Sequence, residues 1–230
     1  MNTKIVAHLT YPYERGEYFA IFAHSFNCSE ENCAAHAITA ELGQADISTL
    51  CINLSDFNHV DASHQSFMLS DYIQDLIMTY EYLSRNYETK ILLIGHSIVG
   101  VAVLTASQHM PNVAAIATIA APADPAHISH LFGVAQTESE EQDKVRLNVE
   151  RALKVSLSHQ LSYLNKPYLI VHSLADEVVD FDNAMDLFDA AREPKKLLPV
   201  DTLDHMMSCP SDAQNIGTEI ASWALPFLKK

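Results

Sequence analysis

The chain has 230 residues, of which 48% are hydrophobic and 19% charged, and its formal net charge at pH 7 is −15. This length and composition predict a folded globular protein with a well-buried core rather than a disordered chain. The acidic balance argues against a nucleic-acid partner, because the protein would repel a phosphate backbone. No apolar run approaches the ~20 residues of a membrane span, so we expect no transmembrane segment.

The N-terminal residues and the cysteines favour a cytoplasmic location. Residues 1–13 contain one lysine and a short apolar stretch, without the small-residue cleavage pattern of a secretory signal. The cysteines show neither a disulfide framework nor paired zinc spacing; they are Cys28, Cys33, Cys51 and Cys209. We therefore expect reduced thiols in a cytoplasmic protein.

Strand and helix patterns alternate along most of the chain. In chain order we predict a strand at 4–9, a strand at 18–23, a helix at 31–42, a strand at 47–54, a helix at 67–85, a strand at 90–94, a helix at 98–109, strands at 113–121 and 167–171, a helix at 183–191, a strand at 195–200 and a helix at 211–228. This alternation predicts an α/β fold with a mostly parallel sheet and helices on both faces. In such sheets the ligand site lies at the carboxyl ends of the strands.

The interval 122–165 interrupts this alternation, because it carries no strand pattern. It contains the acidic run Glu138–Glu141 and a predicted helix at 144–158. An insertion of this length often forms a lid over an active site. The alternative is an extra pair of surface helices. Since there is no internal repeat or linker, we predict a single domain spanning 1–230, with a lid insertion at 122–165.

The segment around Ser97 has the layout of a nucleophile elbow. The apolar run Ile91–Ile94 predicts a buried strand, which is followed by Gly95-His96-Ser97 and then by an apolar helical pattern. A sharp strand-to-helix turn exposes a serine hydroxyl beside the positive end of the helix. The match to the G-x-S-x-G motif is imperfect, because Val99 occupies the second glycine position. We expect Val99 to pack against small residues there, with Ala120 and Ala121 as candidates.

A nucleophilic serine needs a base and an acid, and later strand ends provide candidates for both. Asp176 follows the predicted strand 167–171, and His205 follows the last predicted strand. The chain order Ser97, Asp176, His205 is that of the α/β-hydrolase fold. We therefore predict these three residues as a catalytic triad. The rivals considered for the acid are Glu177, Asp180 and Asp124.

The oxyanion of such a reaction needs two backbone N–H donors. The first candidate is Ile98, directly after the nucleophile, and the second is Phe26, in the loop after the strand 18–23, with Ser25 as its alternative. The same loop could equally contain an ordinary helix cap. His127 and His130 could share a helical face as metal ligands, but no third ligand accompanies them, so we predict no metal site.

Four segments resemble the α/β-hydrolase domain that some bacterial proteins carry ahead of an osmotically-induced-protein-C-type domain. The resemblance runs from about residue 18 to 228, and its segments are Phe22–Ser29, Leu92–Ser97, Ile119–His127 and Asp204–His205. It implies a serine hydrolase that acts on esters or related acyl compounds and needs no metal or organic cofactor. Two departures from the family pattern are Val99 and the loop Ser55–Val60, which lacks a glycine-rich turn.

The expected function is hydrolysis of a carboxylic ester or thioester through an acyl-enzyme, with a small-molecule acyl substrate and no cofactor. The alternative is a weakly active or inactive binding protein that keeps the pocket without the catalytic geometry. The sequence leaves the natural substrate and the oligomeric state open.

Overall fold

The central element of the fold is a seven-stranded sheet in the order β1-β3-β2-β4-β5-β6-β7. The computed structural model describes residues 7–10, 17–24, 34–53, 69–123, 157–201 and 203–229. Its strands are β1 (Ala7–Thr10), β2 (Tyr18–His24), β3 (Ile47–Asn53), β4 (Ile91–His96), β5 (Val113–Ile119), β6 (Tyr168–Ser173) and β7 (Lys195–Val200). β1 pairs antiparallel with β3, and the other neighbouring strands pair in parallel. The predicted mostly parallel sheet is thereby confirmed.

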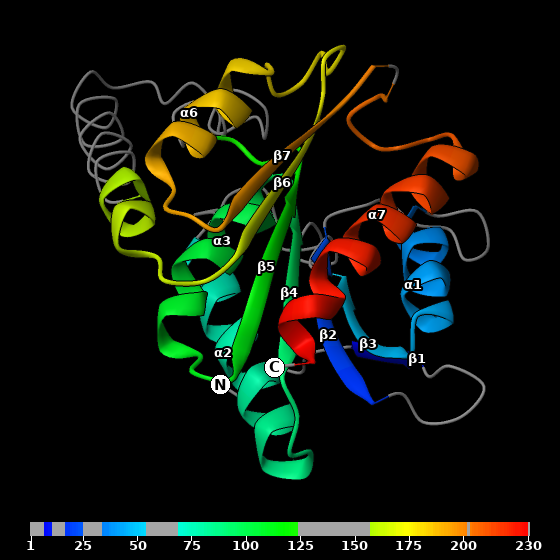
Figure 1. The fold of residues 1–230 in the computed structure, drawn as a ribbon, viewed down its shortest axis with the longest axis vertical. Helices are drawn as coiled ribbons and strands as arrows, with labels where there is room; N and C mark the ends of the chain where they lie inside the picture. The colour runs from blue at the N-terminus through cyan, green and yellow to red at the C-terminus, as the bar shows by residue number, and fades with distance from the viewer. Residues whose placement is uncertain are drawn as a thin grey trace, which may run out of the picture.

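Helices cover both faces of the sheet (Figure 1). On one side lie α1 (Ala34–Gln44) and α7 (Pro210–Leu228), and on the other lie α2 (Leu69–Asn86), α3 (Ile98–Ala106) and α6 (Asp182–Ala190). A short 3₁₀ helix, η3 (Ser107–His109), follows α3, and residues 157–163 are also helical. No helix in the described ranges is both long enough and apolar enough to cross a membrane.

The protein has two hydrophobic cores, one on each face of the sheet, and strand β4 contributes side chains to both. All six of its residues are buried, and alternate side chains point to opposite faces. Ile91 and Leu93 join the first core, with α2, α3 and α6, whereas Leu92 and Ile94 join the second core, with α1 and α7. A continuous apolar run is therefore the correct pattern for this central strand.

Helix α2 illustrates the helical pattern on the first face. Leu76 and Leu83 are fully buried, and Tyr80 is almost so. On the exposed side, Arg85 forms an ion pair with Glu81 one turn earlier, at 2.7 Å. The predicted apolar stripe of this helix therefore faces the sheet, as its spacing requires.

The predicted elements match the structure with shifts of a few residues at their ends. Within the described ranges, the first strand ends at Thr10 rather than residue 9, and the first helix ends at Gln44 rather than residue 42. The helix predicted at 98–109 divides into α3 and η3 after Ala106. Residues 124–156, which hold most of the predicted lid and of the helix at 144–158, lie outside the described residues. Of the cysteines, Cys51 and Cys209 are free thiols, and the other two lie outside those residues too.

Candidate active site

Ser97 occupies the turn between β4 and α3. Its backbone has φ 55° and ψ −134°, in the region that L-residues rarely adopt. The turn is held by a hydrogen bond from the Ser97 N–H to the Ile119 carbonyl at 2.9 Å and by one from the Gly100 N–H to the Ser97 carbonyl at 2.9 Å. Ser97 thus has the strained conformation that the sequence motif predicts.

Two glycines let α3 approach β4 closely behind this turn. A Cβ atom added at Gly95 would lie 2.7 Å from the Cα of Gly100, and one added at Gly100 would lie 2.7 Å from the Cβ of Ala121. Contacts this short would force the helix and strand apart. The small residue that the motif normally places two positions after the serine is therefore supplied one position later, by Gly100.

The packing of Val99 against small residues stays a prediction. Val99 is fully buried in the first core, and so is Ala121, but Ala120 belongs to the second core. The closest approach of the helix to Ala121 is made by Gly100. Of the two predicted neighbours, only Ala121 lies in the same core as Val99.

His205 lies in the connection between β7 and α7 and faces Ser97. Its Nε2 atom is 3.0 Å from the Ser97 Oγ atom, and its Nδ1 atom is 2.9 Å from Oδ2 of Asp176. A donor at Nδ1 leaves Nε2 free of a proton, so that Nε2 accepts the hydrogen bond from the serine hydroxyl. His205 itself is only 9% exposed.

Asp176 lies in the connection between β6 and α6, where its carboxylate accepts bonds from side chain and backbone. Its Oδ1 atom accepts the N–H groups of Val178 and Val179, each at 2.9 Å. Burial alone would raise the pKa of Asp176, but the hydrogen bonds from His205 and from these two amides outweigh it and lower the pKa. An ionised Asp176 is therefore the favoured partner of the His205 Nδ1–H group.

The structure brings Ser97, Asp176 and His205 together from three separate loops at the carboxyl edge of the sheet. The rival carboxylates are placed differently. Asp180 accepts the N–H of Asp182 at the start of α6, and Glu177 is exposed. The third rival, Asp124, lies outside the described residues.

One predicted oxyanion donor can be located. Ile98 is the first residue of α3, where backbone N–H groups lack intrahelical acceptors and the helix end is partially positive. The other predicted donor, Phe26, and its alternative, Ser25, lie outside the described residues. The pair therefore stays a prediction.

Two buried histidines beside the three residues were not singled out from the sequence. His96 precedes Ser97 at the end of β4, and His172 lies near the end of β6. Both are essentially inaccessible to solvent, at 0% and 1% exposure. The sequence signal for both was their place directly after an apolar strand run.

Within the described ranges, no group of three His, Cys, Asp or Glu side chains is arranged to hold a metal ion. The two histidines weighed as metal ligands, His127 and His130, lie outside those ranges.

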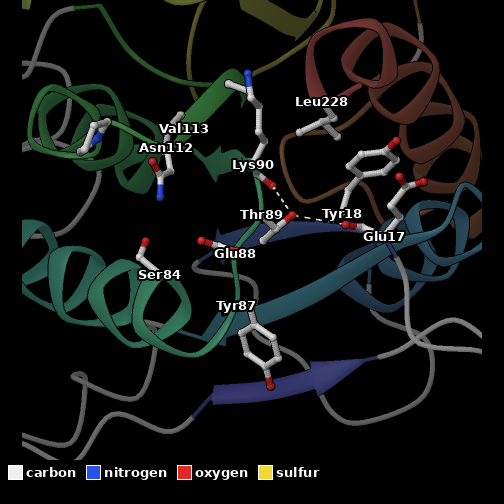
Figure 2. Close-up of a pocket in the computed structure, with 12 residues that line it drawn as sticks. Glu17, Tyr18, Ser84, Tyr87, Glu88, Thr89, Lys90, Asn112, Val113 and Leu228 are labelled. Carbon is white, nitrogen blue, oxygen red and sulfur yellow. Dashed lines mark hydrogen bonds between the residues drawn. The ribbon is translucent and has the colours of Figure 1, made fainter. Parts of the chain in front are cut away.

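A cavity of about 640 Å³ lies at the opposite edge of the sheet (Figure 2). It opens near the amino ends of β2, β4 and β5 and is lined by Tyr18, Glu88, Lys90 and Asn112, among others. Thr89 bonds there to the carbonyls of neighbouring chain segments. None of the three predicted triad residues borders this cavity, and ligands of parallel sheets bind at the carboxyl edge. The candidate active site is therefore the Ser97 edge.

The amino-acid sequence matches a model of a known protein family. The model described as the prolyl oligopeptidase family matches residues 69–229, a range that includes Ser97, Asp176 and His205. The chain belongs to the prolyl oligopeptidase family. The search of curated proteins gives no match.

Solved structures of this fold extend the comparison. The esterase domain of a Rhodothermus marinus protein is 32% identical to this chain, with a TM-score of 0.78, and the match covers 96% of this chain and 92% of that one. Est1E from Butyrivibrio proteoclasticus, solved with ferulic acid, is 17% identical with a TM-score of 0.77, covering 98% and 96% of the two chains. A dienelactone hydrolase from Anabaena variabilis is 18% identical with a TM-score of 0.73, covering 99% and 94%. The α/β-hydrolase fold and a hydrolase function are thus shown. The narrower resemblance to domains fused to osmotically-induced-protein-C-type domains stays a prediction.

Proposed function

We propose that the protein hydrolyses carboxylic esters or thioesters through an acyl-enzyme formed on Ser97. The observation that carries the proposal is the hydrogen-bonded series from the Ser97 Oγ atom to His205 Nε2, at 3.0 Å, and from His205 Nδ1 to Asp176, at 2.9 Å. A serine hydroxyl is a weak nucleophile unless a positioned base accepts its proton. Each of the three groups faces the atom with which it must exchange or share that proton.

In the proposed reaction, Ser97 attacks the acyl carbon while its proton passes to His205 Nε2. The ionised Asp176 stabilises the resulting imidazolium and keeps the Nδ1 proton in place. The oxyanion is held by the N–H of Ile98 and by a second donor, for which Phe26 is our candidate. His205 then protonates the departing alcohol or thiol. Water repeats the sequence to release the acid and free Ser97.

The choice of esters as the substrate class is supported by the name of the Rhodothermus marinus relative, an esterase domain at 32% identity. The family description names an oligopeptidase instead, and the same three residues could cleave an amide. Proline p-nitroanilide is therefore the informative competitor in any activity assay.

The test is the time course of p-nitrophenol release from p-nitrophenyl acetate at enzyme concentrations high enough to resolve the first turnover. We expect a burst of about one equivalent per chain, followed by a slower steady rate, because acylation releases the phenol before water clears the acyl group. Ser97→Ala should abolish the burst and lower kcat by at least about 10³-fold. Ser222→Ala, at an exposed serine on α7, is the matched control and should leave both unchanged.

Three outcomes would contradict the proposal. No burst from the wild-type protein would favour the binding-protein alternative. Retention of more than about a tenth of the activity in Ser97→Ala would remove the serine from the chemistry. Faster turnover of proline p-nitroanilide than of the ester would keep Ser97 as nucleophile but replace the esterase assignment with a peptidase.

A further inference from the structure

Two buried histidines connect the ends of strands to the loops that carry the proposed base and acid. His96 is the last residue of β4, and His172 is the penultimate residue of β6. A polar ring buried this completely is costly unless its nitrogen atoms are used. In both rings, Nε2 lies within hydrogen-bond distance of a main-chain carbonyl on another loop.

His96 contacts the backbone of the proposed base. Its Nε2 atom is 2.9 Å from the carbonyl oxygen of His205, and the two ring centroids are 5.1 Å apart. Since a carbonyl only accepts, Nε2 of His96 carries the proton and donates it. Burial, reinforced by the nearby His205, lowers the pKa of His96 to about 3, so the ring is neutral when the enzyme works.

His172 supports the turn of the proposed acid in a similar way. Its Nε2 atom donates to the Val179 carbonyl at 2.8 Å, and the Val179 N–H in turn donates to Oδ1 of Asp176 at 2.9 Å. The same Nε2 atom lies 3.7 Å from Oδ2 of Asp176. The rings of His172 and Phe181 are nearly perpendicular, with the centroids 5.9 Å apart. His172 thus anchors the carbonyl of the same residue, Val179, whose N–H group bonds the carboxylate.

We propose that His96 and His172 are positioning residues that hold the main chain around His205 and Asp176 in register with Ser97. This inference rests on the proposed function, because it assigns the two rings to the geometry of that triad. The bond between His205 and Asp176 fixes only the side chain of His205. His205 lies in a turn, so its backbone needs a separate anchor to the sheet. A displacement of about 1 Å at a reacting group can cost about 10²-fold in rate.

The test compares pairs of variants that differ in the donor. His96→Phe and His172→Phe fill a similar volume without a ring N–H group, whereas His96→Gln and His172→Gln retain an amide donor at nearly the same reach. We expect the Phe variants to lower kcat for p-nitrophenyl acetate about 10- to 100-fold, with KM changed less than about threefold. The Gln variants should recover most of kcat. The exposed His109, changed to Gln, is the control and should match the wild type.

A spectroscopic readout separates positioning from a general effect on folding. The proton between His205 Nδ1 and Asp176 gives a downfield resonance in ¹H NMR spectra, which reports the geometry of that bond directly. We expect it to weaken or broaden in both Phe variants and to persist in both Gln variants. Thermal unfolding of each variant, followed by circular dichroism, shows whether the fold is intact. If His96→Phe does not fold, His96→Leu supplies the comparison without a donor.

The results that would overturn the inference are distinct from those that would overturn the proposed function. If folded Phe variants keep wild-type kcat and an unchanged resonance, the rings do not position the triad. The same conclusion follows if the Gln variants are as impaired as the Phe variants. The resonance can be measured in a protein without esterase activity, so a failed burst assay leaves the positioning claim open to its own test.

Discussion

Asp176 combines more interactions than any other residue of the proposed triad. Its two carboxylate oxygens accept the Nδ1–H of His205 and the N–H groups of Val178 and Val179. Its side chain is fully buried, so each of these donors compensates for lost water. The lowered pKa of Asp176 shows that the hydrogen bonds prevail over burial. The carboxylate therefore both fixes the histidine tautomer and closes its own turn.

Replacing Asp176 by Asn should lower kcat for an ester substrate by about 10³- to 10⁴-fold, because an amide can donate to Nδ1 and so favour the wrong tautomer of His205. The fold should survive, since the amide oxygen can still accept from Val178 and Val179. Steady-state kinetics with p-nitrophenyl acetate measures the effect. Glu177→Gln removes the adjacent exposed carboxylate and should leave kcat within about twofold. Equal losses in the two variants would mean that net charge matters rather than the bond to His205.

The three residues of the proposed triad could be predicted from the sequence, but the two histidines that we propose as positioning residues could not. Ser97, Asp176 and His205 each follow a strand end, and their order along the chain is informative in itself. His96 and His172 also follow apolar runs, but a histidine at a strand end can equally be solvated or hydrogen-bonded in the core. Only the three-dimensional distance to the His205 and Val179 carbonyls separates these cases.

At the level of elements, the contact between α3 and its neighbouring strands depends on Gly100. A Cβ on Gly100 would lie 2.7 Å from the Cβ of Ala121, and a Cβ on Gly95 would lie 2.7 Å from the Cα of Gly100. A second close contact of this kind is made by Gly217 of α7, where an added Cβ would lie 2.8 Å from the Cβ of Glu41 in α1. Gly100 and Gly217 thus both lie where an added Cβ would clash, but only Gly100 is close to Ser97 in the chain.

Gly100→Ala should lower both stability and activity, because α3 must move away from the strands and its first turn carries Ile98. We expect a loss of about 1–3 kcal/mol in the free energy of unfolding from overpacking, and a fall in kcat of about tenfold or more. Gly217→Ala should cost a similar stability while kcat stays within about twofold, since α7 and α1 meet away from the elbow. Urea unfolding and ester kinetics on both variants check this. A Gly100→Ala protein with normal kcat would show that the elbow is independent of helix packing.

The accuracy of the predicted elements follows the strength of their patterns. Central strands such as β4 are continuous apolar runs, and α2 has a regular apolar stripe, so both were predicted closely. The sequence gives no periodic pattern that would show where the helix predicted at 98–109 divides into α3 and η3. The residues of α3 are almost all apolar, so they show no apolar stripe. The close approach of Gly100 to Ala121 was not predicted, because motif spacing gives positions along the chain and not distances between atoms.

At the scale of the whole molecule, the buried histidines link stability to pH. Burial lowers the pKa of His24 to about 4 and that of His96 to about 3, against an ordinary value of 6.5. Below pH 6.5 the unfolded chain binds protons at these positions while the folded protein does not. Stability therefore falls as the pH is lowered, and the fall continues until each folded-state pKa is reached.

Between pH 6 and pH 5 we expect each of these two histidines to remove about 1 kcal/mol from the free energy of unfolding, within the limit of about 1.4 kcal/mol per pH unit. Asp176 adds little to the slope in this window, because its stabilising effect is lost only below the ordinary carboxyl pKa of 3.8. Urea unfolding at pH 7, 6 and 5 measures the slope. His24→Phe should flatten it, whereas the exposed His109→Gln should not. An unchanged slope in His24→Phe would contradict a buried neutral His24.

The strand order was less accessible from the sequence than the strands themselves. Alternation predicts parallel pairing and helices on both faces, but it does not show that β3 lies between β1 and β2. That order depends on which crossover packs best over the sheet, and such long-range contacts leave no local pattern. The carboxyl edge could nevertheless be used to predict a candidate site, because the rule holds for any order of parallel strands.

Ser97 leaves the ribosome 108 residues before His205, which corresponds to roughly 5 to 20 s of elongation. During that interval the nascent chain carries the nucleophile of the proposed enzyme but no base to accept its proton. The elements on either side of His205, β7 and α7, are also the last in chain order. A chain that ended directly after β7 would hold all seven described strands but lack the proposed base. The order of the three loops thus delays the proposed activity until the segment that carries His205 has been made.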